Sequence, residues 1–364
     1  MIERRKILIG GGLAIAGVTA GYLGMRQMGS MAQYNDAVAA TRAALSEQPA
    51  IADFIRYATL AASGHNTQPW RFRASAQKIE ILPDLSRRTP VVDPDDHHLF
   101  VSLGCAAENL SIAASARGRP GSVNVNAAGD TSVDVVLDQG APLRSALFDA
   151  IPLRQSTRAD YDGRQVSTSD LKALAAASTI PGVDLVLITE RPMIERVRDL
   201  VVAGNMTQIA DPAFVTELKK WLRFSPHTAI ESGDGLFSAA SGSPALPDWL
   251  GKLGFNWVFT PRAENDKYIK QIASSSGIAV FIAEKDDREH WILAGRACQR
   301  FALHATALGL KTAYINQPVE VANLRPQLAN LVGLPGRRPD ILMRFGYGPT
   351  LPYSARRPVS AVLA

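Results

Sequence analysis

The chain has 364 residues, of which 46% are hydrophobic and 20% are charged. This composition excludes a disordered chain, a collagen-like repeat and a polytopic membrane protein. The formal net charge is +5, of which +3 falls in residues 1–32, so the rest of the chain lacks the basic excess that is typical of nucleic-acid binding.

The first 32 residues have the layout of an export signal. Arg4, Arg5 and Lys6 precede an uncharged, Gly- and Ala-rich stretch at 7–25, and the adjacent arginines resemble a twin-arginine signal. Small residues up to Ala32 predict cleavage after that position and release into the periplasm. The alternative is an inner-membrane anchor, because the 19 residues 7–25 just span a bilayer. The resemblance to a twin-arginine signal implies export of a protein that has already folded around its cofactor. We therefore expect a cofactor site in the rest of the chain, after residue 32.

The first half of the remainder, residues 33–150, mixes helix and strand. Residues 34–61 predict a helix with an interruption at Pro49, and the alternating residues 78–82 predict a short strand. Residues 99–117 predict an Ala-rich helix that ends at Gly118, since glycine is the usual residue after a helix C-terminus.

The same order returns in the second half, residues 151–364. A β-branched run at 277–283 predicts a strand, and 291–308 predict a second Ala-rich helix that ends at Gly309. Helices this rich in small residues can approach closely, so we expect the two to cross near the middle of the molecule. The repeated pattern predicts a fused pseudo-dimer. The alternative is a chance likeness between two α/β motifs.

The two cysteines of the chain, Cys105 and Cys298, lie inside the Ala-rich helices. They are too few for a disulfide scaffold or a cysteine-based zinc module, and buried thiols are expected. An interhelical disulfide is the alternative.

Between the two repeats, residues 231–248 are rich in Gly, Ser and Pro. Such a stretch is either an active-site lid or a long surface loop. Trp70 is expected to pack under the loop that contains it. The remaining tryptophans are interpreted as core or lid packing: Trp221, Trp249, Trp257 and Trp291.

The segment 63–70 reads S-G-H-N-T-Q-P-W and follows the first predicted helix. Pro69 restricts Gln68 to extended geometry, so the chain leaves the helix through a defined turn. The Ser, His, Asn and Gln side chains supply the donors and acceptors that the edge of a heterocycle requires. Taken alone, the segment is better explained as an ordinary capping loop.

Two further segments are candidates for binding a phosphate. Residues 154–158 read R-Q-S-T-R, in which two arginines can fork around a phosphate while the hydroxyls donate further bonds. The C-terminal run 344–358 carries Arg356 and Arg357, which could complete a dianion site. The alternatives are a solvated basic turn and a basic tail.

Together these motifs resemble the nitroreductase family of FMN flavoproteins. The matching elements are N-x-Q-P-W, R-x-S-x-R, the A-L-G-L of residues 307–310, and the closing G-Y…P…R-R-P. The two-half layout, with S-G-H-N-T-Q-P-W and the R-R-T-P-V-V-D-P of residues 87–94, resembles the Acg-type FMN-binding branch. The resemblance covers roughly residues 34–364. It implies an α+β fold of two fused halves, each an antiparallel sheet flanked by helices, with FMN at the interface of the halves.

The resemblance also implies roles for individual residues. The phosphate would be held by Arg154, Ser156 and Arg158, with Arg356 or Arg357 completing the site. The ring would be faced by Ser63, Gly64, His65, Asn66 and Gln68. The loop beside the reactive edge of the flavin would hold Asn316 and Gln317, where many relatives have an acidic residue. Because each half carries only one part of the site, one FMN per chain and a monomer are expected.

The implied activity is that of an FMN-dependent oxidoreductase, which passes hydride through flavin N5 to a small electron-poor acceptor without a protein nucleophile. His65 is either a proton donor or a neutral hydrogen-bonding partner. An exported protein meets little NAD(P)H, so the donor would be a quinol or a redox protein. The alternative is a protein that sequesters FMN without turnover.

A metal enzyme is the weakest interpretation. It is prompted by the run Asp95-Asp96-His97-His98 and by Asp286, Asp287 and His290. Adjacent residues point in different directions on most backbones, and the sequence lacks the usual i, i+4 pair of histidines.

Overall fold

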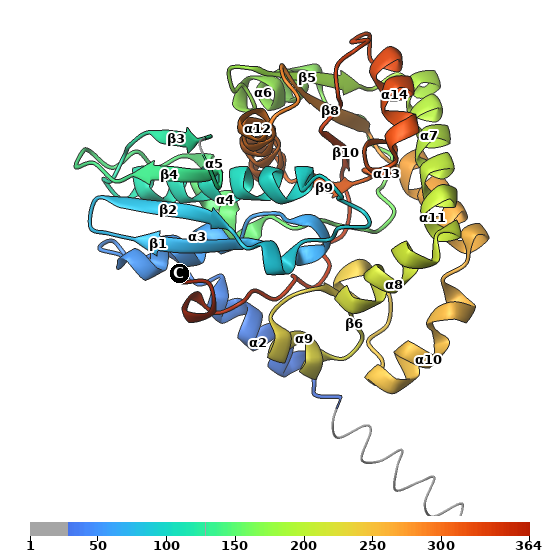
Figure 1. The fold of residues 1–364 in the computed structure, drawn as a ribbon, viewed down its shortest axis with the longest axis horizontal. Coiled ribbons are helices and arrows are strands. Elements are labelled where there is room, and N and C mark those ends of the chain that lie inside the picture. Colours follow the sequence, from blue (N-terminus) through green and yellow to red (C-terminus); the bar gives the residue numbers. More distant parts are fainter. Residues whose placement is uncertain (1–27, 128) are drawn as a thin grey trace, which may run out of the picture.

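The computed structural model describes residues 28–127 and 129–364 and contains two four-stranded antiparallel sheets with helices packed around them (Figure 1). The predicted twin-arginine motif and the stretch 7–25 lie outside the described residues. The predicted cleavage position, after Ala32, falls in the first turn of α2 (Met31–Thr41). The predicted α+β fold with antiparallel sheets flanked by helices is confirmed.

The first sheet belongs to the N-terminal half, and its strands lie in the order β1-β2-β4-β3. The strands are β1 (Trp70–Ala74), β2 (Lys78–Pro83), β3 (Val123–Asn126) and β4 (Ser132–Val136). In the described part of the chain, the helices α2 and α3 (Ile51–Thr59) precede the sheet, and the gap between them contains Pro49, as predicted. The long helix α4 (His97–Ala116) joins β2 to β3, and α5 (Ala146–Ala150) follows β4.

The second sheet has the order β5-β8-β10-β9. Its strands are β5 (Val183–Ile188), β8 (Gly277–Ala283), β9 (Lys311–Tyr314) and β10 (Ile341–Gly346). In both sheets the second strand along the chain leads into a long helix, which is α4 in the first half and α12 (Arg288–Ala307) in the second. The chain then forms the strand at the far edge of the sheet and returns to form the strand that lies between this edge strand and the second strand. The two sheets therefore share one connectivity. The helices α6 (Thr168–Ala177), α13 (Gln317–Glu320) and α14 (Arg325–Leu331) complete this half.

The halves differ in what joins their first two strands. A short turn joins β1 to β2, whereas residues 189–276 lie between β5 and β8. This insertion contains five helices: α7 (Arg191–Ala210), α8 (Pro212–Trp221), α9 (Pro226–Ser232), α10 (Asp248–Val258) and α11 (Pro261–Ala273). It also contains the short parallel pair β6 (Leu222–Arg223) and β7 (Leu236–Phe237). Figure 1 shows α8, α9 and α10 together at one end of the molecule.

The Ala-rich helices α4 and α12 cross, as predicted, and the crossing is built on glycines. A Cβ atom on Gly104 would overlap the main-chain oxygen of Ile292, and one on Gly295 would overlap that of Val101. The two cysteines meet beside this crossing as free, buried thiols with their Sγ atoms 3.7 Å apart. α4 is long and apolar enough to span a bilayer, but 89% of its most apolar window is buried inside the protein. It is therefore the core helix of the fold.

The predicted elements agree with the structure within a few residues, because their periodicity and glycine stops are strong local signals. Gly118 and Gly309 follow the long helices with φ of +71° and +76°. The prediction for two tryptophans is wrong. Trp249 and Trp257 on α10 are 58% and 79% exposed rather than packed.

Candidate functional site

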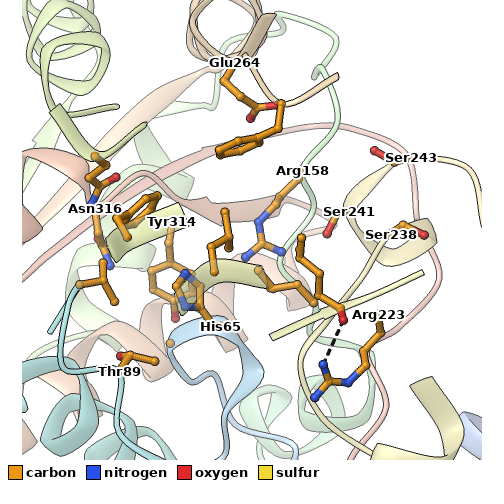
Figure 2. Close-up of a pocket in the computed structure, with 18 of the residues that line it drawn as sticks. His65, Thr89, Arg158, Arg223, Ser238, Ser241, Ser243, Glu264, Tyr314 and Asn316 are labelled. Carbon is orange, nitrogen blue, oxygen red and sulfur yellow. Dashed lines mark hydrogen bonds between the residues drawn. The ribbon is translucent and has the colours of Figure 1, made fainter. Parts of the chain in front are cut away.

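A cavity of about 560 Å³ lies between the two halves and the helical insertion. It is lined by the 62–65 loop, the start of α4, Arg158, the β9–α13 connection and the helices α7, α8, α10 and α11. Figure 2 shows His65, Arg158, Tyr314 and Asn316 around one space, with Glu264 of α11 on its far side. A volume of this size is typical of a cofactor or small-molecule site.

The segment 63–70 forms a tight turn at the cavity wall. His65, Asn66 and Gln68 all have positive φ, at 47°, 55° and 53°, so the prediction that Pro69 restricts Gln68 to extended geometry is wrong. L-residues rarely adopt this geometry, and it persists where surrounding contacts impose it, which is common at functional sites. One such contact is local, since the Gln68 N–H donates to Ser63 Oγ at 3.1 Å.

The amides of Asn66 and Gln68 hold the turn against two other segments. Asn66 Nδ2 donates to the carbonyl oxygens of Gly235 and Ala355, at 3.0 and 3.2 Å. Gln68 Nε2 donates to Gly233 O at 2.8 Å, and its Oε1 accepts from the Arg357 N–H at 2.9 Å. These side chains therefore tie the loop to the insertion and to the C-terminal tail and do not line the cavity.

His65 lines the cavity, and its Nδ1 atom is buried with no hydrogen-bond partner among the described residues. Burial, together with the charges of Arg158 and His98, lowers the pKa of His65 to about 4. The ring is then neutral at pH 7. Of the two predicted roles, this pKa supports the neutral hydrogen-bonding partner.

The R-Q-S-T-R segment places its two arginines differently. Arg158 lines the cavity, and burial lowers the pKa of its guanidinium. Arg154 is buried behind the wall and donates to Leu60 O at 3.1 Å, while its Nε and Nη1 find no partner among the described residues. Ser156, between them, forms an isolated parallel bridge with Thr312.

Two more buried arginines accompany Arg154. Arg42 is the residue that follows α2, and its guanidinium stacks on the Tyr353 ring with Cζ 4.1 Å from the ring centroid. Burial, together with the charge of Arg154, lowers the pKa of Arg42 to about 9. The Arg356 guanidinium donates hydrogen bonds to the carbonyl oxygens of residues 59–61 and to Asn66 Oδ1. Among the described residues no carboxylate pairs with Arg42, Arg154, Arg158 or Arg356.

Arg357 lies apart from this group. Its guanidinium donates to Ala361 O and Gln68 O, and Asp84 lies 3.8 Å from it. It therefore fastens the C-terminal tail to the 63–70 turn.

The β9–α13 connection brings Asn316 and Gln317 to the cavity. Asn316 is fixed because its Oδ1 accepts from the Leu342 N–H at 2.9 Å. Positions 316 and 317 carry no acidic residue, but Glu320, one helical turn further along in α13, also lines the cavity. Burial raises the pKa of Glu320, which accepts from Gln208 Nε2 at 2.5 Å.

Sequence analysis missed a titratable group at the start of α4. His98 lines the cavity with Asp93, whose Oδ1 lies 3.7 Å from His98 Nδ1. Burial acts to lower the pKa of His98, but the hydrogen bond and charge of Asp93 outweigh it and raise the pKa. On the other side, Asn316 Nδ2 lies 3.2 Å from His98 Nε2, a contact that favours the neutral ring. His98 is thus a titratable group on the cavity wall whose pKa is raised by Asp93.

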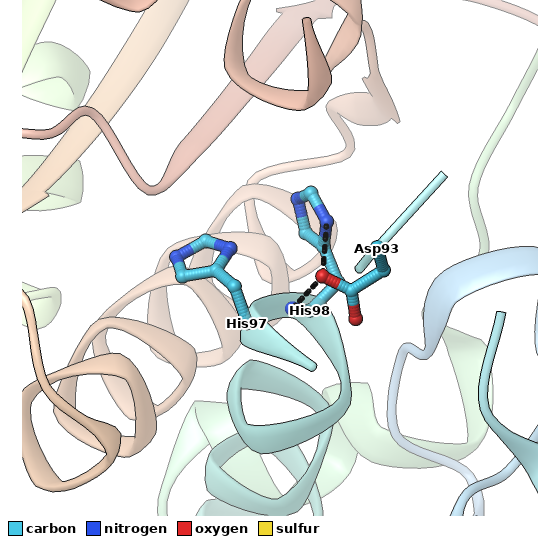
Figure 3. A group of neighbouring side chains, drawn as sticks. All are labelled: Asp93, His97 and His98. Carbon is cyan, nitrogen blue, oxygen red and sulfur yellow. Dashed lines mark hydrogen bonds and ion pairs between the residues drawn. The ribbon is translucent and has the colours of Figure 1, made fainter. Parts of the chain in front are cut away.

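Asp93, His97 and His98 also offer ligand atoms within 4.8 Å of one another (Figure 3). Most of these atoms already have protein partners, and only His97 Nδ1 is buried without one among the described residues. The Asp93 carboxylate accepts from the N–H groups of His98 and Leu99, and His97 Nε2 lies 2.8 Å from Asp340 Oδ1. The cluster is better explained as the N-terminal cap of α4 than as a metal site.

The structure thus brings six of the twelve predicted site residues to the cavity wall: Ser63, Gly64, His65, Arg158, Asn316 and Gln317. The other six lie behind or beside it: Asn66, Gln68, Arg154, Ser156, Arg356 and Arg357. Their predicted contacts with a cofactor stay predictions. The segment 231–248 also reaches the cavity, through Leu236, Ser238, Ser241 and Leu246, so it covers one side as a lid would.

No protein-family model matches the chain. It is 27% identical over 324 residues to "Putative NAD(P)H nitroreductase Rv3131" of Mycobacterium tuberculosis, covering 84% of this chain and 88% of that protein. It is 25% identical over 327 residues to "Putative NAD(P)H nitroreductase acg" of the same organism, covering 85% and 93%. The predicted resemblance to the Acg-type branch is therefore confirmed.

Solved structures give distant matches. An FMN-dependent nitroreductase, NfnB from Mycobacterium smegmatis in complex with NADPH, aligns with a TM-score of 0.37 and 12% identity, covering 56% of this chain and 87% of that one. A nitroreductase with bound FMN from Desulfitobacterium hafniense gives a TM-score of 0.36 and 12% identity, covering 59% and 94%.

Proposed function

We propose that this chain, a relative of the mycobacterial nitroreductases Rv3131 and acg along more than four fifths of its length, is an FMN-dependent oxidoreductase. The observation that carries the proposal is a set of buried arginines, Arg42, Arg154, Arg158 and Arg356, that have no carboxylate partner within residues 28–127 and 129–364 and lie beside a cavity lined with polar groups. A buried charge without a counterion costs several kcal/mol, so a fold that keeps several such charges together is built for an anion.

The phosphate of FMN fits this arginine set. Arg154 has two buried nitrogens without partners among the described residues, and Arg158 presents its guanidinium to the cavity. Charge-assisted bonds from these groups contribute about 1.5–3 kcal/mol each. Arg42 adds positive charge from the first half, whereas Arg356 is committed to main-chain carbonyls and shapes the site from behind.

The ring end fits the opposite wall of the cavity. When bound, FMN supplies hydride transfer through its N5 atom. His65, with its unpartnered Nδ1, would hydrogen-bond the edge of the ring, and His98 would hold or release a proton beside it. The apolar side chains of α10 and the segment 231–248 would exclude water from the cavity.

We infer one FMN per chain and a monomeric protein. The 63–65 turn comes from the first half and Arg158 from the second, and both line the same cavity. The shared connectivity of the two sheets supports descent from a fused pair of protomers. The acceptor would be a small electron-poor molecule.

The N-terminal residues 1–32 determine where the protein is located, and its location determines which electron donors it meets. Ser30 caps α2 through a capping box with Gln33, so removal of residues up to Ala32 would strip the first turn of a helix whose Tyr34 is fully buried. This favours the uncleaved anchor over release into the periplasm. In either case the donor would be a quinol or redox protein rather than NAD(P)H.

Export of a green fluorescent protein fusion to residues 1–40, with and without Arg4 and Arg5, tests this localisation. Cytoplasmic retention with both arginines present would refute it.

An absorbance spectrum of the purified full chain, followed by anaerobic titration with NADPH and then dithionite, tests the function. Flavin bands at one FMN per chain that bleach with NADPH, or with a quinol, support an oxidoreductase. Flavin that only dithionite bleaches supports the alternative, an FMN-sequestering protein, which the cover formed by 231–248 favours. A colourless protein that FMN cannot restore would refute both.

A further inference from the structure

The outer face of α10 is a continuous exposed apolar surface. Trp249, Leu253 and Trp257 follow one another at four-residue spacing, so they lie on one side of the helix, and they are 58%, 60% and 79% exposed. Single exposed apolar side chains are ordinary, but two tryptophans and a leucine in a row on a soluble surface mark an interaction site.

The same helix forms part of the cavity wall. Gly251, Gly254 and Phe255 face the cavity, and they come from the side of α10 next to the exposed face. Leu250 and Val258 belong to both surfaces, since both line the cavity while Leu250 is 38% exposed and Val258 is 72% exposed. The apolar surface therefore continues from the outside of α10 to the edge of the cavity.

α10 lies at the end of the molecule where the described chain begins. The Asp248 carboxylate, at the start of α10, accepts from Ser225 Oγ at 2.6 Å and from the Thr228 hydroxyl, which lie at the start of α9. In α9 the His227 N–H donates to Met28 O at 3.0 Å. Figure 1 shows α2, α9 and α10 at this same end. The uncharged sequence 7–25 is thus joined to the fold beside α10.

Basic side chains flank the apolar face. Lys252 lies on α10, Arg262 begins α11 and is 93% exposed, and Lys219 contacts Asn256 of α10 at 2.8 Å. Acidic side chains also occur on α11, where Asp266 lies 4.0 Å from Arg262 and Glu264 lies 3.7 Å from Lys267. Tryptophan at the interface, leucine below it and lysine or arginine at the edge is the pattern of a helix that lies in the surface of a bilayer.

We propose that α10 docks on a membrane surface that contains anionic lipid, with Trp249, Leu253 and Trp257 inserted at the headgroup level. The surface is assigned to lipid rather than to a second copy of the chain because Lys252, Arg262 and Lys219 border it and because it lies at the end of the molecule where the described chain begins, after the uncharged sequence 7–25. A small apolar substrate dissolved in the bilayer would then reach the cavity at Leu250 and Val258. Only this last consequence rests on the proposed function.

Tryptophan quenching by brominated lipid tests the docking. The full chain is bound to phosphatidylglycerol–phosphatidylcholine vesicles with and without brominated acyl chains. Quenching is expected in the brominated vesicles and is expected to fall by more than half in the double variant W249F/W257F, which keeps the apolar face. Trp221→Phe is the matched control and leaves the quenching unchanged. Wild-type protein that floats with vesicles without quenching, or quenching that the double variant retains, would overturn the proposal.

Two further measurements separate the alternatives. A Trp257→Glu variant should lose the quenching from Trp249, whereas Leu143→Glu, at a 70% exposed leucine elsewhere, should not. A blue shift of tryptophan emission that grows with protein concentration without lipid would assign the face to a second copy and overturn the proposal. Because the quenching does not require flavin, quenching in a protein that binds no FMN would refute the proposed function alone. With FMN bound, a vesicle-borne quinol should reduce W257E more slowly than wild type, and dithionite should reduce both alike.

Discussion

Gly104 of α4 and Gly295 of α12 lie against each other where the two central helices cross, with the Cα of Gly104 in direct reach of any side chain on Gly295. The two glycines are 191 residues apart, the same separation as Gly118 and Gly309, which end the two helices. The two halves therefore meet through equivalent positions, as expected for a local two-fold relationship. This contact fixes the boundary at which the cavity forms.

The substitution Gly104→Ala should destabilise the protein by about 1–3 kcal/mol, because the new methyl group overlaps the Ile292 carbonyl and forces the helices apart. Chemical denaturation measures the loss. Gly254→Ala on α10 is the control, since its methyl group would meet nothing within 4 Å and should leave stability equal or slightly higher. Equal effects of the two variants would contradict the close crossing.

The substitution Arg154→Met should weaken FMN binding by about 10- to 100-fold, because it removes the two guanidinium nitrogens that have no protein partner and is expected to cost about 1.5–3 kcal/mol. Titration of flavin fluorescence measures the affinity. Arg164→Gln removes an exposed arginine paired with Asp162 and serves as the control. Unchanged affinity in Arg154→Met would place the phosphate elsewhere.

If His98 supplies a proton during turnover, the rate should fall as the pH rises through its raised pKa. The variant Asp93→Asn removes the charge that favours the protonated ring, so this fall should move to lower pH, and His98→Gln should abolish it. His65→Gln should leave it in place, because the pKa of His65 is about 4 and its ring stays neutral throughout. Stopped-flow flavin kinetics against pH provide the measurement. A fall that survives in His98→Gln would assign it to another group.

The substitution Asp248→Asn should loosen α10 by about 1 kcal/mol, a value at the low end for such bonds because the group is partly exposed. Burial acts to raise the pKa of Asp248, but the bonds from Ser225, Thr228 and the Phe224 N–H outweigh it and lower the pKa. Because the folded-state pKa lies below the unfolded value, this stabilisation is present above the unfolded pKa and is lost as the pH falls through the folded one. Limited proteolysis near residues 244–260 should be faster in the variant at pH 7, and the difference should shrink in acid.

Much of the fold could be predicted from the sequence. The strand 277–283 and the two long helices were recognised because a buried β-branched run, an Ala-rich helix and a glycine with positive φ are local signals. The S-G-H-N-T-Q-P-W motif predicts a defined turn after the first helix, but not its geometry, since three of its residues adopt positive φ and Gln68, expected to be extended, is one of them. The sequence did not reveal that Asn66 and Gln68 hold the turn in place, because their partners, such as Ala355 and Gly233, are more than 160 residues away.

The sequence by itself determined the elements of each half, the resemblance to the Acg-type branch and the residue types available for a phosphate and a ring. Only the tertiary structure decided which of those residues reach the cavity, that His98 rather than His65 can change its charge there, and that Trp249 and Trp257 face outward. The physical reason is that periodicity identifies the apolar face of a helix but not what covers it. Burial, charge pairing and pKa depend on segments that meet only when the chain has folded.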